Sequence, residues 1–349
     1  MPDYSDLNAL VRGPIPSRPL PCFFDFAPCH AGMVGGIPNL TRYYFDVEEK
    51  LEIQMRVKDL LPEALILPGI FADFGVVVEV SAFGGRIHWF ENGAPFIGPV
   101  LESLEEIDHL KPPQPGTTGL TAPLLIQQEM LQRKLRGKGK ELDPWAFSMG
   151  PAEIAGLLLG YDRYYCGLYD DPKRIQALME MITDFILGWI RTQERQIGEI
   201  QALMIADHVV SQVNPNHLET FILPYLQAIF QAFPKPIKIY HNEGLHSPRH
   251  IQAILKSGVE VWHFGSDVHS LEDLYSQIGD RIVPWGGLNP HGAIRTGSPD
   301  EVRKETRKAK QAAKGKRLLL STGTGTTPDA SLENVRAMVE EALTDSANI

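Results

Sequence analysis

The feature of this chain that most limits its fold is a series of short apolar runs, each followed by a turn and then by a helical pattern. Most of the runs are continuously apolar rather than alternating, which is typical of strands buried on both faces of a parallel sheet. We predict eight such strands, at residues 22–26, 64–73, 145–150, 202–207, 237–243, 259–267, 282–289 and 317–325.

Helical patterns fill most of the gaps between these runs. The segment 247–258 is representative, because it begins with Ser247 as a cap and Pro248 in the first turn and ends at Gly258. Similar patterns predict helices at 46–62, 171–200, 214–233, 247–258, 270–279, 298–315 and 331–343. This alternation predicts an α/β chain folded as a closed (β/α)8 TIM barrel, and a doubly wound parallel sheet is the alternative.

The regular alternation breaks after the second predicted strand. Residues 76–100 resemble a β-hairpin that turns at Gly84 and Gly85, and residues 111–123 are rich in proline and read as a loop. We interpret residues 76–143 as an insertion over the barrel mouth, so that residues 1–349 form one TIM-barrel domain.

Charge and composition exclude several classes of protein. The net charge is −10, and the most basic run, residues 133–140, is interrupted by glycine. It predicts a solvated loop, with a docking patch for an acidic partner as the alternative, and nucleic acid is not an expected partner. We also expect no membrane association, because no apolar run approaches the roughly 20 residues that span a bilayer.

The first residues and the cysteines favour a cytoplasmic location. The N-terminal residues lack the basic and apolar regions of a signal peptide. Three cysteines, Cys22, Cys29 and Cys166, are too few and too widely spaced for a disulfide framework or a Cys-rich metal site.

Polar and titratable residues follow almost every predicted strand, and in a TIM barrel the chemistry gathers at these carboxyl ends. Taken singly, each has a structural interpretation: an aspartate often caps a helix, and His263 lies beside Trp262, where it can simply pack. Asp207 and His208 should point in opposite directions if the strand continues, so at most one of them faces the barrel axis. The set is Asp25, His30, Asp73, Ser148, Asp207, His208, His241, Asn242, Glu243, His263, Asp267, Asn289, Ser321, Thr322 and Thr324.

His241 and Glu243 form the strongest pair in this set. They are two residues apart at the end of a predicted strand, so both side chains should project to the same face. An imidazole and a carboxylate that converge there can ligate a divalent cation such as zinc, or act as a proton donor with its orienting partner. A hydrogen bond that braces the barrel rim is the structural alternative.

Taken together, these strand ends resemble the uroporphyrinogen decarboxylase superfamily. The matching segments are residues 217–230, 237–244, 283–290 and 318–342, and the resemblance extends from about residue 20 to 345. It implies a barrel fold and one of two activities. One branch decarboxylates uroporphyrinogen without a cofactor, and the other transfers methyl groups to or from a corrinoid, usually with zinc.

Comparison with the two branches favours methyl transfer. Residues 21–36 match the Arg-rich segment with which the decarboxylases grip porphyrin carboxylates, but they contain no arginine. Residues 323–325 read Gly-Thr-Gly, where the decarboxylases have Gly-His-Gly and the methyltransferases Gly-Cys-Gly. The methyltransferase motif His-x-Cys is matched by His241 and Glu243. The resemblance thus implies that Glu243 takes the place of one zinc-binding thiolate and Thr324 that of the other.

Replacing sulfur by a carboxylate oxygen makes a metal centre harder, which suits an oxygen leaving group. The chain therefore resembles the methyltransferase component of a corrinoid-dependent O-demethylase. That component would transfer the methyl group of a phenyl methyl ether to the cob(I)alamin of a separate corrinoid protein. His241 and Glu243 would activate the ether oxygen, directly or through zinc. A methyltransferase for methylamines or thiols such as coenzyme M is the alternative, as is a corrinoid-binding protein without activity, and uroporphyrinogen decarboxylase is less favoured.

The same interpretation assigns roles to further residues. Asp207 or Asp267 would supply a third ligand or orient the imidazole, and Asp73 and Asn289 would hydrogen-bond the substrate. Phe24, Tyr165 and Trp262 would form part of an apolar slot for the aromatic ring. The tyrosines of residues 161–169 would serve instead as a cation cage if the donor were an amine.

Overall fold

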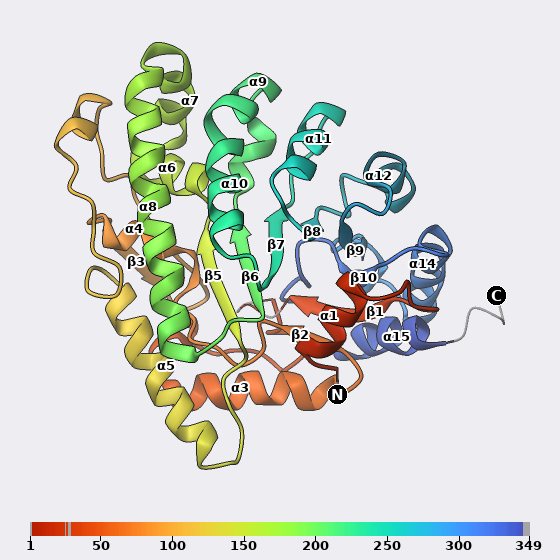
Figure 1. Ribbon diagram of the computed structural model, residues 1–349. Coiled ribbons are helices and arrows are strands. Elements are labelled where there is room, and N and C mark those ends of the chain that lie inside the picture. The colour runs from red at the N-terminus through yellow and green to blue at the C-terminus, as the bar shows by residue number, and fades with distance from the viewer. Residues whose placement is uncertain (1, 25, 27–28, 345–349) are drawn as a thin grey trace. The chain divides into compact units, whose positions relative to one another are not determined.

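The computed structural model describes residues 2–24, 26 and 29–344. The chain forms two compact units, which are described separately. Unit 1 comprises Met1–Ile70, Asn242–Leu245 and Glu260–Ile349, and unit 2 comprises Phe71–His241 and His246–Val259. Figure 1 shows the elements of both units along the chain.

Unit 1 contains five parallel strands in the order β2-β1-β10-β9-β8. Their side chains are largely buried, and all four residues of β10 are buried, as expected for a sheet covered on both faces. The strands are β1 (Leu20–Phe24), β2 (Leu65–Leu67), β8 (Val261–Phe264), β9 (Val283–Leu288) and β10 (Leu319–Thr322). The helices of this unit are α1 (Tyr4–Arg12), α2 (Leu40–Phe45), α3 (Val47–Leu60), α12 (Leu271–Ile278), α13 (Ala293–Thr296), α14 (Pro299–Ala312) and α15 (Leu332–Leu343).

Unit 2 contains three parallel strands in the order β7-β6-β5, and they run side by side in Figure 1. They are β5 (Trp145–Met149), β6 (Ala202–Ala206) and β7 (Ile237–Asn242), and β7 ends where the next segment of unit 1 begins. The antiparallel hairpin β3 (Ile87–Phe90) and β4 (Gly93–Ile97) also lies here. The helices are α4 (Val78–Ala82), α5 (Thr121–Arg136), α6 (Pro151–Leu159), α7 (Tyr161–Asp170), α8 (Pro172–Ile197), α9 (Pro215–His217), α10 (Leu223–Ala232) and α11 (Pro248–Lys256).

Short 3₁₀ and π segments complete unit 2 and matter for the site. The 3₁₀ segments are Gly75–Val77, Glu105–His109 and His208–Gln212, and a π-helical turn covers Leu218–Ile222. The segment His208–Gln212 directly follows β6 and Asp207, so the chain turns sharply at the end of that strand.

The predicted fold class is confirmed: eight parallel strands alternate with helices, and each lies within or next to a predicted run. The helix caps explain much of this success. Ser247, Ser298 and Ser331, for example, each accept a hydrogen bond from a backbone N–H in the first turn of the helix that follows. Whether residues 1–349 behave as one domain, with residues 76–143 over a barrel mouth, stays a prediction.

Two local predictions are wrong. The hairpin does not turn at Gly84 and Gly85, because Val78–Ala82 form helix α4, and the strands lie at 87–90 and 93–97. All five residues of α4 are buried, so packing outweighs the β-propensity of its valines. The basic run 133–140 is not entirely a loop, since α5 continues to Arg136. Pro123 falls in the predicted loop, but it lies in the first turn of α5, where proline is tolerated.

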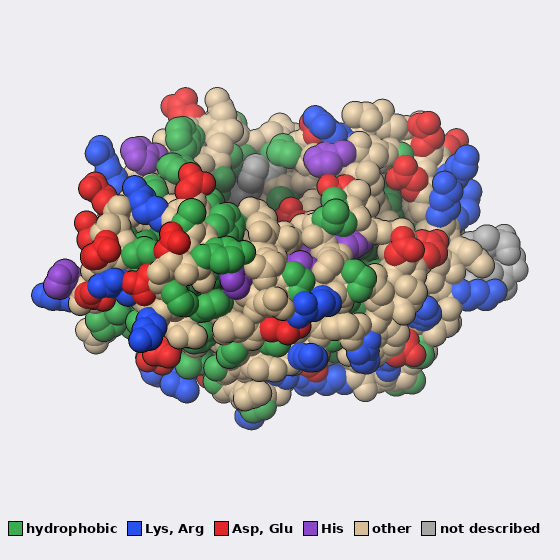
Figure 2. All heavy atoms as spheres, turned by 90° about the horizontal axis from the view of Figure 1, so that it is seen from above, with side chains coloured by type: hydrophobic (Ala, Val, Ile, Leu, Met, Phe, Trp, Pro, Cys, Tyr) green, Lys and Arg blue, Asp and Glu red, His purple; other side chains and the backbone are tan. Residues whose placement is uncertain are grey.

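No helix in the described part of the chain is long and apolar enough to cross a bilayer. In Figure 2 basic and acidic side chains are interspersed over the visible face, which agrees with a modest net charge of −10.

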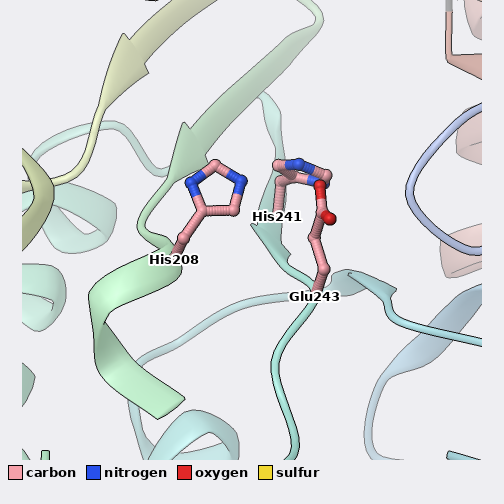
Figure 3. A group of neighbouring side chains, drawn as sticks. All are labelled: His208, His241 and Glu243. Atoms are coloured by element: carbon pink, nitrogen blue, oxygen red, sulfur yellow. The ribbon is translucent and has the colours of Figure 1, made fainter. Parts of the chain in front are cut away.

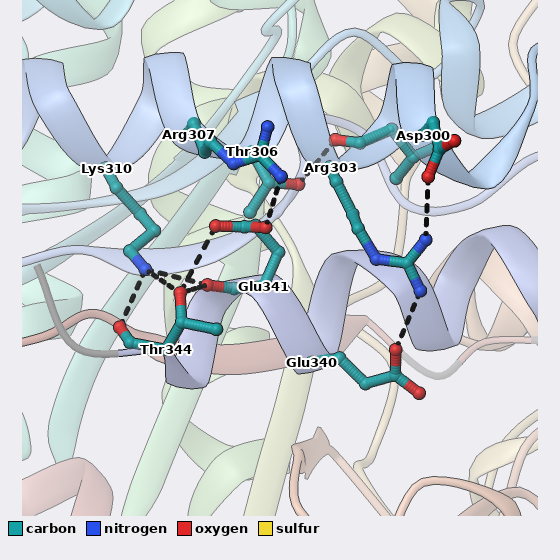
Figure 4. Close-up of polar contacts among 9 residues, drawn as sticks. Asp300, Arg303, Thr306, Arg307, Lys310, Glu340, Glu341 and Thr344 are labelled. Carbon is teal, nitrogen blue, oxygen red and sulfur yellow. Dashed lines mark hydrogen bonds and ion pairs between the residues drawn. The ribbon is translucent and has the colours of Figure 1, made fainter. Parts of the chain in front are cut away.

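A buried lysine joins α14 to the end of α15 (Figure 4). The ammonium of Lys310 donates to the carbonyl oxygens of Glu341 (2.7 Å) and Thr344 (2.8 Å) and to the Thr344 hydroxyl (2.8 Å). Both carbonyls lie at the carboxyl end of α15, where a cation is favourable. Lys310 thus stabilises the carboxyl end of α15.

A second buried charge lies in α4 of unit 2. The Glu79 carboxylate accepts a hydrogen bond from the Met149 N–H at 3.4 Å, and its side chain is almost completely buried. Burial, only partly offset by hydrogen bonds, raises its pKa from 4.5 to about 7.

We predict that Lys310→Met lowers the free energy of unfolding by about 1–3 kcal/mol, because three hydrogen bonds from a buried ammonium are lost. Arg303→Ala is the matched control in the same helix pair. Its exposed ion pairs with Glu340 (2.9 Å) and Asp300 (3.2 Å) should contribute less than about 1 kcal/mol. Urea unfolding measures both, and an equal effect of the two substitutions would contradict the role of Lys310.

We predict that Glu79→Gln reduces the pH dependence of stability. Between the unfolded pKa of 4.5 and the folded value of about 7, the folded chain keeps a proton that the unfolded chain loses. Stability therefore falls as the pH rises through this window, and the glutamine variant lacks this contribution. Urea unfolding at about pH 5 and about pH 8 should show a smaller difference for the variant, and parallel profiles would refute the assignment.

Candidate metal centre

The site begins where β6 and β7 end next to each other. Ala206 pairs with His241 in the parallel register, and the N–H of Asp207 donates to the carbonyl oxygen of His241 at 3.0 Å. His208 follows Asp207 in the 3₁₀ segment, and Glu243 lies two residues beyond His241 along the chain. Two strand ends therefore supply side chains to one place.

Three of these side chains converge (Figure 3). His208, His241 and Glu243 each offer one ligand atom, and these atoms all lie within 4.8 Å of one another. The two imidazole rings are 5.0 Å apart between centroids and nearly perpendicular, at 86°. His241 is buried, whereas His208 and Glu243 are half-buried.

The donor set fits a divalent cation. Two imidazole nitrogens and one carboxylate oxygen form one of the three-ligand sets of catalytic zinc, in which a fourth position stays open to water or substrate. Bonds of about 2.0–2.2 Å to one ion keep two ligand atoms within about 4.4 Å of each other, so small side-chain rotations would bring this group into range. His208, His241 and Glu243 could therefore hold a metal ion.

The buried carboxylate of Glu153 contacts both the backbone and the ring of His208. Glu153, in the first turn of α6, accepts hydrogen bonds from the N–H groups of His208 (2.8 Å) and Val209 (3.1 Å). The same oxygen, Oε2, lies 3.5 Å from Nδ1 of the His208 ring. The other oxygen, Oε1, accepts from the Tyr161 hydroxyl at 2.6 Å. Burial raises the pKa of Glu153, but the contacts with His208, Tyr161 and Val209 outweigh it and leave the pKa lowered.

Asp207 is not part of the group of three converging side chains. It is fully buried, and its Oδ2 accepts a hydrogen bond of 3.4 Å from the N–H of Ala152 at the start of α6. Burial and then the nearby charge of Glu153 raise its pKa well above the usual range. Gly150 makes room for this carboxyl group, since a Cβ there would lie 2.4 Å from the Asp207 Cβ. The structure thus gives Asp207 a helix-capping position, and its predicted catalytic role stays a prediction.

Tyr165 and Asp73 are the other predicted site residues in unit 2. The Tyr165 hydroxyl donates to Oε1 of Gln212 at 2.7 Å, and its ring stacks on Tyr161 at 6.3 Å and 22°. Burial, with the charges of Glu153 and Asp207, raises the pKa of Tyr165 to about 12. Asp73 is buried, and its Oδ1 accepts from the N–H of Gly75 at 2.7 Å, as in a turn.

Unit 1 holds Phe24 in an aromatic cluster. Its half-buried ring lies 4.6 Å from Phe26, 5.1 Å from His263 and 5.8 Å from Trp285, measured between centroids. His263 stacks on Trp285 at 4.2 Å and 23°. Phe24 therefore packs in an aromatic cluster, and its predicted contact with an aromatic substrate stays a prediction.

The remaining predicted residues of unit 1 lie elsewhere. Trp262 is completely buried and donates from its indole N–H to the Asn242 carbonyl at 3.2 Å, so it packs and does not border an open surface. Asp267 is exposed. Asn289 is also exposed, and its Oδ1 accepts from the N–H of His291 at 2.8 Å, as in a turn. Asp25 lies outside the described residues.

Comparison with known proteins supplies the family. The model of the family described as "Uroporphyrinogen decarboxylase (URO-D)" matches residues 36–344. The chain belongs to the uroporphyrinogen decarboxylase family.

Similar proteins of this family carry two different names. Uroporphyrinogen decarboxylase of Ruthia magnifica is 22% identical over 281 residues, which are 78% of each chain. The enzyme of that name from Xylella fastidiosa is 25% identical over 285 residues, again 78% of each chain. Among solved structures, a methyltransferase from Methanosarcina mazei superposes with a TM-score of 0.78 at 18% identity and covers 96% of both chains. This likeness confirms the (β/α)8 fold, and the chain is thus related to enzymes.

Thr324, which the resemblance puts in the place of the second zinc-binding thiolate, has an unusual backbone conformation. Thr324 has a φ of +124° between Gly323 and Gly325, and its N–H lies 3.5 Å from Nε2 of His263 in unit 1. Such a φ is strained for a residue with a branched side chain, and strain of this kind often marks functional sites. Among the described residues, Thr324 is not part of the group formed by His208, His241 and Glu243.

Sequence reasoning missed two residues of the site. His208 is in the candidate set, but strand alternation allows only one of Asp207 and His208 to face the barrel axis, and the proposed roles go to Asp207. The strand ends at Ala206, and the 3₁₀ segment that follows brings His208 into the group instead. Glu153 lies in a helix that was not predicted. The signal for it was present, since one acid interrupts the otherwise apolar segment 151–159.

Proposed function

We propose that this protein is a methyltransferase that transfers the methyl group of an O-methyl compound, a phenyl methyl ether, to the cob(I)alamin of a separate corrinoid protein. The observation that carries the proposal is the sulfur-free group of His208, His241 and Glu243. By the resemblance to the corrinoid-dependent branch, Glu243 takes the place of one zinc-binding thiolate. The likeness to a methyltransferase structure is consistent with it.

Decarboxylation of uroporphyrinogen is disfavoured by charge. A substrate with many carboxylates needs cationic partners to offset the loss of hydration, and residues 21–36 contain no arginine. Around the site the structure instead gathers two carboxylates, Glu153 and Glu243, which would repel such a substrate.

In the proposed reaction the bond between the methyl carbon and the ether oxygen breaks, and a cobalt–carbon bond forms from the electron pair of the reduced corrinoid. The oxygen keeps the electron pair of the broken bond and leaves as a phenolate, which then takes up a proton. Relief of this developing charge is the main task of the protein, because phenolate leaves poorly from an unactivated methyl group. Cobalt, carbon and oxygen must be nearly collinear, so the ether has to be held in one orientation.

A zinc ion held by His208, His241 and Glu243 would supply Lewis-acid stabilisation of the leaving oxygen. His208 has its Nδ1 directed at Glu153, which leaves Nε2 for a ligand. If no metal is bound, His241 would instead be the proton donor to the same oxygen, with Glu243 as its orienting partner. His208 is thus the proposed third ligand, in place of Asp207 or Asp267.

Exposure separates the predicted substrate contacts. Phe24 and Tyr165 are half-buried and are the proposed contacts for an aryl group. Asp73 and Asn289 already accept hydrogen bonds within turns, which makes them weaker candidates for hydrogen bonds to ring substituents. Trp262 and Asp267 are also weaker candidates, because Trp262 is fully buried and Asp267 is exposed.

A methylamine is the second candidate donor. Tyr161 and Tyr165 stack on each other close to Glu153, and aromatic faces near a carboxylate attract a cation. Their hydroxyl groups donate hydrogen bonds to Glu153 and Gln212, so the two rings are held in place and are less able to rearrange around a cation. A thiol such as coenzyme M is less favoured, because a nitrogen and oxygen donor set lacks the softness that sulfur substrates prefer.

We predict that a guaiacol-type ether supports methylation of reduced corrinoid protein, with release of the phenol, whereas methylamines and methyl thiols do not. The visible spectrum of the corrinoid follows the transfer. His241→Ala and Glu243→Ala should each lose far more than tenfold in rate, since tenfold corresponds to only about 1.4 kcal/mol of barrier. Turnover with amines alone would overturn the choice of donor.

We predict one equivalent of zinc per chain, lost on chelation and restored by added zinc. His208→Ala, His241→Ala and Glu243→Ala should each weaken binding, because two ligands hold zinc less well than three. Asp267→Asn is the matched control, since this exposed acid lies outside the group. Competition with a chromophoric chelator measures the affinity, and undiminished binding by His208→Ala would remove His208 from the site.

A further inference from the structure

Glu153 is a buried acid with an unusual set of partners. Only 5% of the residue is exposed, and the other eight residues of α6 are apolar. Desolvation of a carboxylate is costly unless hydrogen bonds or opposite charges compensate for it. An acid in the first turn of a helix gains something from the helix dipole, but that benefit does not require contacts to another element.

The Glu153 side chain reaches out of its own helix to the segment after β6. One oxygen contacts the backbone N–H groups of His208 and Val209 and the Nδ1 of His208, and the other accepts from Tyr161. The main chain and the ring of His208 are thus held by the same carboxylate oxygen. This double contact fixes the position of the residue and the rotation of its imidazole together.

The contact between Glu153 and Nδ1 of His208 also favours one tautomer of the imidazole. A carboxylate oxygen facing Nδ1 favours a proton on that nitrogen, so the lone pair of neutral His208 lies on Nε2. In Figure 3 one ring nitrogen of His208 is turned toward His241 and the other is turned away from it.

We propose that Glu153 is a positioning residue that holds His208 in the orientation and tautomer needed for ligation, and that Tyr161 secures Glu153 by binding its second oxygen. This inference rests on the metal site of the proposed function but not on the identity of the methyl donor. A purely structural alternative is that Glu153 only pins the 3₁₀ segment His208–Gln212 to α6.

Zinc affinity and the stability of the zinc-free protein separate these two roles. Glu153→Gln keeps an oxygen that can accept from the two backbone N–H groups but removes the charge that faces Nδ1. We expect zinc affinity to fall by about 10- to 100-fold, with a small change in the thermal midpoint of the zinc-free protein. Tyr161→Phe should weaken zinc binding in the same direction but less, because Glu153 keeps its contacts with His208.

Glu79→Gln is the matched control, since it makes the same substitution at another buried acid of unit 2 that contacts Met149. Its zinc affinity should equal that of the unchanged protein. Chelator competition and the visible spectrum of the cobalt(II)-substituted protein provide readouts that do not depend on methyl transfer. Unchanged zinc affinity and an unchanged cobalt spectrum in Glu153→Gln, with or without a loss of stability, would overturn the proposal and leave the metal site standing. A chain that binds no zinc at all would overturn the metal site, and the positioning role with it.

Discussion

The hydrogen bond from the N–H of Asp207 to the carbonyl oxygen of His241 sets the geometry on which the site depends. It follows the last residue pair of the parallel β6–β7 register, Ala206 and His241, and keeps the two strand ends side by side. Beyond it, the chain at Asp207 turns into the 3₁₀ segment, so that Asp207 points to α6 and His208 points to His241. A slip of one residue in this register would exchange the two faces and separate the imidazoles.

Much of the fold could be read from the sequence, because buried parallel strands and capped helices leave strong local signals. The continuous apolar runs predicted all eight parallel strands, and serine caps predicted the starts of α11, α14 and α15. The elements that escaped prediction are those in which packing overrides propensity. In α4 a valine-rich segment is helical because every side chain is buried, and α6 and α7 meet at Gly160, which has a φ of +78° and no side-chain cap.

The site was only partly readable, for a reason of the same kind. His241 and Glu243 follow the alternation of one strand, so their common direction could be inferred from spacing alone. His208 depends on where β6 stops, and Glu153 reaches the site from a helix far away in the sequence. Contacts between distant segments leave no periodic trace, whereas Asp73 and Asn289 carried polar signals that turned out to belong to turns.

The fit between Gly150 and Asp207 limits how this site can diverge. A methyl group at position 150 would occupy the space of the Asp207 carboxyl group, with contacts of 2.4–2.5 Å. A larger residue at 150 is therefore compatible only with a smaller one at 207, and the start of α6 would then lose the capping carboxyl beside Glu153. Relatives with a larger residue at position 150 should therefore have a smaller residue at position 207, so the glycine is required by the aspartate.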